Sequence, residues 1–158
     1  MGQGETVGPV EQSVGYILKQ ASAALRAAMD AALRPLQLTV PQYACLELLG
    51  QWPGLSNAEL ARGVFVTRQS MNGVLRGLQD RGLLARPTSA PHGRALPTRL
   101  TPDGHSRLHA ASTAVRAVER QMLTALAPSA QRQLRANLSA CAAALTAQVT
   151  EGPDDPAE

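Results

Sequence analysis

The stretch VTRQSMNGVLRGLQDRGLLARP, residues 66–87, guides the interpretation of the whole chain. Four of its apolar residues recur at the spacing of one face of an α-helix: Met71, Val74, Leu75 and Leu78. The opposite face carries amides, a glycine and charged groups: Gln69, Asn72, Gly73, Arg76 and Asp80. Ordinary solvent-exposed helix faces are rich in Glu and Lys, so this pattern predicts an amphipathic helix whose outer face recognises a ligand.

The composition indicates one globular domain with a sizeable core. The chain has 158 residues, of which 44% are hydrophobic and 17% charged. Only 3% are aromatic, and alanine is abundant, which favours packed helices over a sheet sandwich. Two cysteines are too few for a disulfide framework. We see no secretory signal and no apolar run of about 18 residues, so we expect a cytoplasmic protein without a membrane segment.

The positive charge is concentrated in the middle of the sequence. The net charge is +3, but residues 60–100 hold seven arginines and a single acid, Asp80. The rest of the chain is therefore net negative. A basic centre between acidic ends predicts a site for a polyanion, although a solvated basic face is the alternative.

Sequence signals predict six helices. A long helix is expected from Glu11 to about Leu33, ending before Pro35. Shorter helices are expected at 40–49 after Thr39, at 57–63 after the capping box that starts at Ser56, and at 68–81 after Thr67. Two more long helices are expected at 102–126 and at 128–149. The Gly-, Pro- and acid-rich ends, 1–9 and 151–158, are expected to be disordered.

Between the fourth and fifth helices the pattern changes to a hairpin. Residues 83–88 and 96–101 are predicted strands, joined by a Pro/Gly turn at 89–95 that carries Arg94. Two short helices joined by a tight link and followed by a hairpin are typical of a winged helix-turn-helix. We therefore predict a mainly α fold with a small β-hairpin wing, in which a winged helix-turn-helix region at 37–101 is flanked by helical dimerisation regions at 10–36 and 102–150.

The hydrogen-bonding groups in the DNA grooves explain the polar side chains of the predicted recognition helix and hairpin. An α-helix fits the major groove of DNA, where Arg can bond to guanine and Asn or Gln to adenine. Residues near the start of the second helix reach the base edges, and the wing arginine reaches the minor groove or the backbone. The candidate DNA-binding residues are Ser56, Asn57, Thr67, Arg68, Gln69, Ser70, Asn72, Gly73, Arg76, Arg86, Arg94 and Arg99.

Several segments together resemble the MarR family of bacterial transcriptional regulators. They are LTVPQYACLELL, LSNAELAR, VTRQSMNGVLRGLQDRGLLAR and RLTPDG, and the resemblance covers about residues 10–149. It implies a homodimer with interlocked terminal helices, which binds an inverted-repeat operator in double-stranded DNA, most often as a repressor. It also implies release by a small lipophilic or aromatic effector, for which Tyr43 and Cys45 are the candidate binding residues. The family's wing commonly has an Asp two residues before its arginine, where this chain has His92.

Some single residues have alternative interpretations that would indicate a metal- or redox-responsive regulator. His105 and His109 have a spacing used for metals, but the matching stretch offers only Cys45 and Glu47 as further ligands. Cys45 and Cys141 fit buried positions on apolar helix faces, with redox sensing as the alternative. We assign no metal site and no cofactor, and we find no catalytic motif. The alternatives to an effector-released repressor are a non-sequence-specific architectural DNA-binding protein, a redox- or metal-responsive regulator, and a protein-interaction module.

Overall fold

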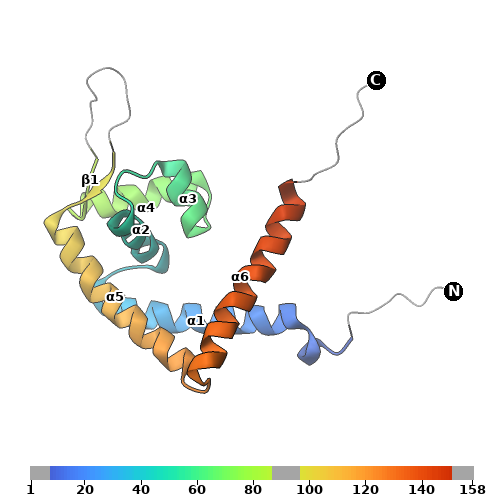
Figure 1. The fold of residues 1–158 in the computed structure, drawn as a ribbon. Coiled ribbons are helices and arrows are strands. Elements are labelled where there is room, and N and C mark those ends of the chain that lie inside the picture. The colour runs from blue at the N-terminus through green and yellow to red at the C-terminus, as the bar shows by residue number, and fades with distance from the viewer. Residues whose placement is uncertain (1–7, 87–96, 151–158) are drawn as a thin grey trace, which may run out of the picture. The chain divides into compact units, whose positions relative to one another are not determined.

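The computed structural model describes residues 8–86 and 97–150 (Figure 1). This part is mainly helical, with one small antiparallel strand pair, as the sequence predicts. It divides into two compact units, residues 1–119 and 120–158, which we describe separately. The predicted disordered ends lie outside the described residues, except for Gly8 and Pro9. No helix in the described ranges is long and apolar enough to cross a membrane.

The first helix, α1, spans Val14–Leu33 and begins later than the sequence suggests. Val10–Gln12 form a separate 3-10 helix, and the Ser13 side chain then caps α1 by accepting a hydrogen bond from the backbone of Tyr16. The expected start at Glu11 is therefore wrong. After α1, a 3-10 helix at Arg34–Leu36 contains Pro35, which explains why the α-helix stops at Leu33.

Helices α2 (Val40–Gln51) and α3 (Asn57–Val64) both begin with a capping box, at Thr39 and Ser56 respectively. The expected end of α2 before Gly50 is wrong, because the helix continues through this residue. A Cβ at Gly50 would lie 2.6 Å from Cδ2 of Leu108. This glycine therefore allows close packing inside the unit and does not end the helix.

Helix α4 spans Arg68–Asp80, and its end matches the expected signal at Gly82. Gly82 has a φ of 71°, a left-handed conformation that suits glycine. The chain then enters β1 (Leu84–Ala85), which pairs with β2 (Arg99–Leu100) in antiparallel register, with Leu84 opposite Leu100. The paired segments are shorter than the expected strands at 83–88 and 96–101. The hairpin tip, with His92 and Arg94, lies outside the described residues.

Helix α5 spans Pro102–Leu123, and α6 spans Pro128–Thr150. Thr101 anchors the start of α5, because its hydroxyl donates to the Gly82 carbonyl (2.6 Å) and accepts from the Gly104 amide (3.0 Å). The described side chains of α6 are exposed with the exception of Gln131, which is half-buried. The expected apolar stripe of this helix is therefore uncovered in a single chain, with Leu145 67% exposed.

The core lies in the first unit and joins α2, α3 and α4 to the ends of the flanking elements. Its buried residues are Leu33, Leu38, Cys45, Leu46, Leu49, Leu60, Ala61, Met71, Leu75, Leu78, Leu83, Leu84 and Ala111. The N-terminal half of α1 contributes none of them, and Val14 in that half is 78% exposed. The apolar surface of α1 is therefore only partly used by the chain's own core.

The glycines of this unit yield a stability prediction. A Cβ at Gly104 would collide with the carbonyl oxygen of Leu83, which is backbone and cannot move aside cheaply. We expect Gly104→Ala to lower the free energy of unfolding by about 2 kcal/mol or more. Gly73→Ala is the matched control, because a Cβ there meets nothing within 4 Å. It should raise the free energy of unfolding by about 0.5–1 kcal/mol through helix propensity.

Urea unfolding followed by circular dichroism measures both values. Equal changes in the two variants would show that the contact between Gly104 and the Leu83 backbone is not tightly packed.

Candidate nucleic-acid interface

The outward face of α4 is polar because its inward face is fixed by the core. Met71, Leu75 and Leu78 are buried at the spacing of one helical face. Their burial sets the rotation of the helix about its axis. The predicted recognition residues of this helix are all exposed: Arg68, Gln69, Ser70, Asn72, Gly73 and Arg76. The sequence prediction of a helix with a buried apolar face and an exposed polar face is confirmed.

The beginnings of α3 and α4 are held by side-chain caps. Ser56 Oγ accepts from the Glu59 amide (3.2 Å), and the Glu59 carboxylate accepts from the Ser56 amide (2.7 Å). These bonds and the nearby Arg62 hold the pKa of Glu59 below its ordinary value. At α4, Thr67 Oγ1 accepts from the Ser70 amide (3.1 Å). The positions of the first residues of both helices are thus well defined relative to their own helix axes.

A side-chain bond joins the two helices at this surface. Asn57 Nδ2, in the first turn of α3, donates to Asn72 Oδ1 on the outward face of α4. Beside this pair, Gly73 leaves open space above the helix backbone. A flat, accessible stretch of α4 therefore lies next to an amide pair.

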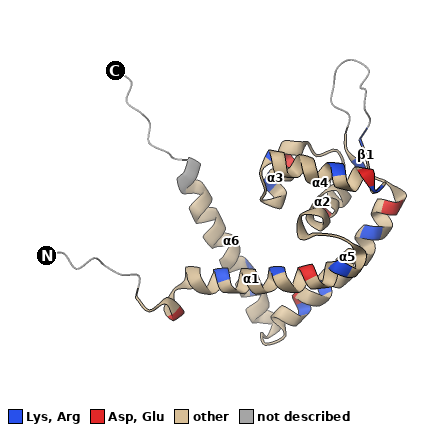
Figure 2. Cartoon of the chain, turned by 180° about the vertical axis from the view of Figure 1, so that it is seen from behind, with Lys and Arg blue, Asp and Glu red and all other residues tan. Residues whose placement is uncertain are grey.

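Exposed arginines surround this face (Figure 2). The figure shows basic positions on α3 and α4 and beside β1. Arg86 follows β1, and Arg99 in β2 lies opposite Ala85, so both lie at the base of the hairpin and both are exposed. The described residues contain one ion pair, Arg26 with Asp30 on α1, so none of the arginines around this face forms an ion pair within them.

One arginine of the basic region has a structural partner. Arg81 Nη1 donates to the Gln37 carbonyl (2.6 Å), at a residue with a left-handed φ of 55°. Arg107 makes a similar bond to the Leu36 carbonyl (2.8 Å). These two bonds attach the connection between α1 and α2 to the rest of the first unit.

Sequence reasoning missed one feature of this surface. Phe65, in the link between α3 and α4, is 93% exposed and has a φ of 63°. Bulky residues rarely adopt this left-handed conformation. Nothing in the sequence distinguishes Phe65 from an ordinary apolar residue that packs in the core.

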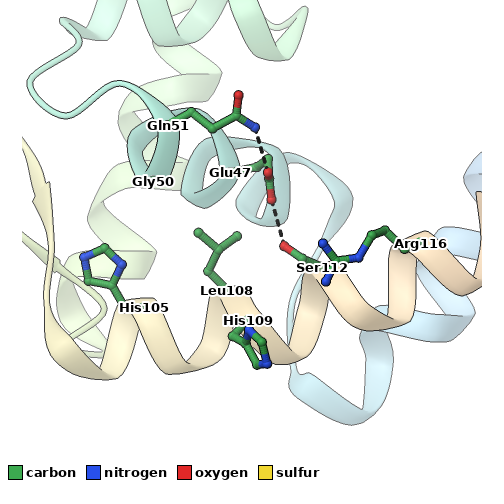
Figure 3. Close-up of a pocket in the computed structure, with 8 residues that line it drawn as sticks. All are labelled: Glu47, Gly50, Gln51, His105, Leu108, His109, Ser112 and Arg116. Atoms are coloured by element: carbon green, nitrogen blue, oxygen red, sulfur yellow. Dashed lines mark hydrogen bonds between the residues drawn. The ribbon is translucent and has the colours of Figure 1, made fainter.

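A separate pocket lies between α2 and α5 and has a volume of about 310 Å³ (Figure 3). Its lining residues are Glu47, Gly50, Gln51, His105, Leu108, His109, Ser112 and Arg116. The Glu47 carboxylate accepts one hydrogen bond from each helix. The donors are Gln51 Nε2 of α2 (2.8 Å) and Ser112 Oγ of α5 (2.8 Å). The pocket lining therefore includes the hydrogen-bonded carboxylate of Glu47, an arginine, two imidazoles and an apolar side chain.

The carboxylate in this pocket is held in its charged form. Partial burial of Glu47 favours the neutral acid, but the hydrogen bonds from Ser112, Gln51 and Tyr43 and the charge of Arg116 outweigh burial and lower its pKa. Burial and the charge of Glu47 raise the pKa of Tyr43, whose hydroxyl donates to that carboxylate (3.2 Å). The pocket floor is therefore an ionised acid with three donors.

The two candidate effector residues differ in position. Tyr43 is half-buried and reaches the pocket through its bond to Glu47. Cys45 is 0% exposed and belongs to the core, and burial raises the pKa of its thiol to about 12 despite the nearby charge of Arg86. Cys141 is exposed, which contradicts the expectation that both cysteines are buried. The reason is that the apolar stripe of α6 is uncovered in a single chain.

The two histidines predicted as a pair also lie at this pocket. His105 and His109 are exposed on α5 and line it together with Glu47. Within the described ranges, no group of three or more His, Cys, Asp or Glu residues is arranged to hold a metal ion.

Comparison with known proteins places this architecture in a family. Residues 36–95 match the model of the MarR family. The HTH-type transcriptional repressor Rv2887 of Mycobacterium tuberculosis is 47% identical over 122 residues, which cover 77% of this chain and 88% of that protein. The structure of this M. tuberculosis MarR family protein in complex with p-aminosalicylic acid is 44% identical, with a TM-score of 0.70, over 82% of this chain and 98% of that one. Its complex with DNA is 43% identical, with a TM-score of 0.70, over 82% and 97%. This chain belongs to the MarR family.

Proposed function

We propose that this protein is a sequence-specific transcriptional repressor, which binds a pseudo-palindromic operator as a homodimer and is released by a small aromatic or lipophilic effector. The observation that carries the proposal is the exposed polar face of α4, backed by buried Met71, Leu75 and Leu78. The similarity to a repressor whose complex with DNA is known supports it. We place this function in the cytoplasm and assign the protein no enzymatic role.

The proposed DNA contacts divide into three groups. The first turns of α4 enter the major groove, where Gln69, Asn72 and Arg76 can reach base edges. The capping hydroxyls of Ser56 and Thr67 and the amides at the helix starts bind phosphates. Arg86, Arg94 and Arg99 of the hairpin bind the backbone or the minor groove beside it. Together these contacts provide both affinity and sequence choice.

A homodimer would cover apolar surface that a single chain leaves exposed. Val14, Ile17 and Leu18 are exposed on α1, and Leu138 and Leu145 are exposed on α6. Large exposed apolar patches typically mark an interface. We therefore propose that regions 10–36 and 102–150 form the dimer and present two α4 helices to half-sites about 34–36 Å apart.

The pocket between α2 and α5 is the proposed effector site. A relative binds p-aminosalicylic acid, an aromatic carboxylate. In this chain Arg116 offers a partner for a carboxylate, Leu108 offers an apolar wall, and Glu47, to which the Tyr43 hydroxyl donates, forms the floor. The ligand would act by binding one arrangement of α2 and α5 better than another, since only differential affinity shifts such an equilibrium.

The burial of Cys45 argues against a redox-responsive regulator that senses oxidants through this residue. A thiol with a pKa of about 12 is protonated at neutral pH, and the thiolate is the form that reacts with oxidants. An architectural DNA-binding protein would bind all duplexes alike, whereas a repressor prefers its operator by roughly 10³ or more.

Arg76 provides the test of sequence-specific binding. We expect Arg76→Ala to weaken operator binding by about 1–3 kcal/mol and to relax base choice at one position, because an arginine on this face can bond to guanine in a bidentate manner. Fluorescence anisotropy with operator and scrambled duplexes measures the change. Arg132→Ala, at an exposed position of α6, is the control with the same loss of charge and should leave both affinities nearly unchanged.

An equal loss of affinity for both duplexes would contradict base recognition by Arg76 and assign it to a phosphate.

Arg116 provides the test of the effector site. We expect salicylate to weaken operator binding by the wild-type protein. Arg116→Ala should weaken salicylate binding about tenfold or more, since it removes a charge-assisted hydrogen bond. Its affinity for DNA without salicylate should stay the same, because the pocket lies apart from the α4 surface. Arg120→Ala is the control, an exposed arginine of α5 outside the pocket lining.

Anisotropy titrations with increasing salicylate measure this response. An undiminished response of Arg116→Ala would show that the effector binds elsewhere.

A further inference from the structure

We propose that Asn57 is a positioning residue that determines which end of the Asn72 amide faces DNA. In this arrangement Asn72 presents a hydrogen-bond donor and selects bases whose major-groove edge carries acceptors. The inference rests on the proposed function, because it concerns how the α4 surface reads its operator.

A hydrogen bond joins the side chains of Asn57 and Asn72. Asn57 Nδ2 donates to Asn72 Oδ1, which leaves Asn72 Nδ2 as the outer end of that amide. Asn72 is exposed, whereas Asn57 is half-buried. The Oδ1 atom of Asn57 is itself buried and has no hydrogen-bond partner within the described residues. The Asn57 amide therefore points its oxygen inward and its nitrogen toward α4.

The reverse orientation of the pair is less favourable. If both amides turned over, Asn57 would accept from Asn72 and its NH₂ group would be buried. A buried NH₂ leaves two donors without partners, whereas the observed orientation leaves one acceptor. Each unsatisfied buried polar group costs free energy. The surroundings of Asn57 thus favour the orientation in which Asn72 Oδ1 is occupied.

The backbone around both residues is fixed, so the pair is a defined feature of the surface. Asn57 is the first residue of α3 and follows the capping box of Ser56 and Glu59. Asn72 lies in the second turn of α4, whose start is capped by Thr67. The packing of α3 on α4 relies on buried Leu60 and Met71, among others, whereas neither Asn57 nor Asn72 belongs to the buried core. The bond therefore contributes little to the fold and acts mainly on the orientation of Asn72.

The orientation changes which bases suit Asn72. An unconstrained asparagine prefers adenine, because it accepts from N6 and donates to N7. With one lone pair of Oδ1 occupied by Asn57, the outward Nδ2 favours edges that carry acceptors. Guanine offers acceptors at N7 and O6 and thymine at O4, adenine offers an acceptor at N7 beside a donor at N6, and cytosine offers only a donor at N4. The structure therefore favours guanine or thymine over adenine, whose edge matches the outward Nδ2 only at N7, as the base that Asn72 contacts.

Binding-site selection from a pool of random duplexes, followed by sequencing, tests this assignment. The wild type should enrich an operator with guanine or thymine at the position whose preference is lost in Asn72→Ala. In Asn57→Asp the carboxylate accepts from Asn72 Nδ2 and turns Oδ1 outward. The preference at that position should then move to cytosine or adenine, with a change of about tenfold in the ratio of affinities. Preferences at all other positions should be unchanged.

A matched control separates this effect from the added negative charge. Ser56→Asp places the same charge one residue away, and aspartate retains the helix cap. It should lower affinity for all sequences and leave the base preference unchanged. Asn57→Ala and the double variant Asn57→Ala/Asn72→Ala, together with Asn72→Ala, form a double-mutant cycle. The double variant should be no less selective than Asn72→Ala alone, because Asn57 acts through Asn72.

The outcomes that overturn the inference are distinct from failure of the proposed function. An unchanged base preference in Asn57→Asp, or additive losses in the double variant, would show that Asn57 does not orient Asn72. In that case the wild type would still select an operator. If the wild type enriches no sequence at all, the proposed function fails and the inference fails with it. Thermal melts of each variant by circular dichroism establish that the proteins compared are folded.

Discussion

The burial of one face of α4 is the constraint on which the rest of the structure depends. Met71, Leu75 and Leu78 are fully buried or nearly so, and each contributes roughly 1.5–3 kcal/mol when it leaves water. A turn of one residue about the helix axis would expose part of this face and hide the amides opposite. Because the core sets the rotation of the helix, Asn72 and Arg76 lie on the outward face whatever bonds their side chains make. The same packing therefore provides both stability and the recognition surface.

The flanking helix α5 connects the α4 surface to the proposed effector pocket through α2. Glu47 on α2 is bonded to Ser112 on α5, so the helix that supports the core is joined to a helix of the proposed dimerisation region. A ligand in the adjacent pocket would contact both Arg116 and the Glu47 carboxylate, which already accepts hydrogen bonds from Gln51 and Ser112. Binding there can shift α2 relative to α5 only if it favours one arrangement, which is the physical requirement for release from DNA. In the proposed homodimer, the exposed apolar residues of α6 would pack against the second copy.

Local signals made much of this fold predictable. The caps at Thr39, Ser56 and Thr67 act within three residues, so the sequence predicts the starts of α2, α3 and α4 correctly. Features that depend on distant residues were not predictable. Gly50 resembles a helix stop but makes room for a side chain of α5. The bonds from Asn57 to Asn72 and from Ser112 to Glu47 join residues 15 and 65 positions apart, and no local pattern reveals them.

The central claim is that two outward α4 faces read the major groove of one duplex. Protection of guanine N7 from methylation tests it most directly, because this atom lies in the major groove. With the operator bound, the account predicts two groups of protected guanines, separated by about one helical turn and related by the operator's symmetry. Protection that is absent, spread evenly along the duplex, or confined to a single group would contradict it.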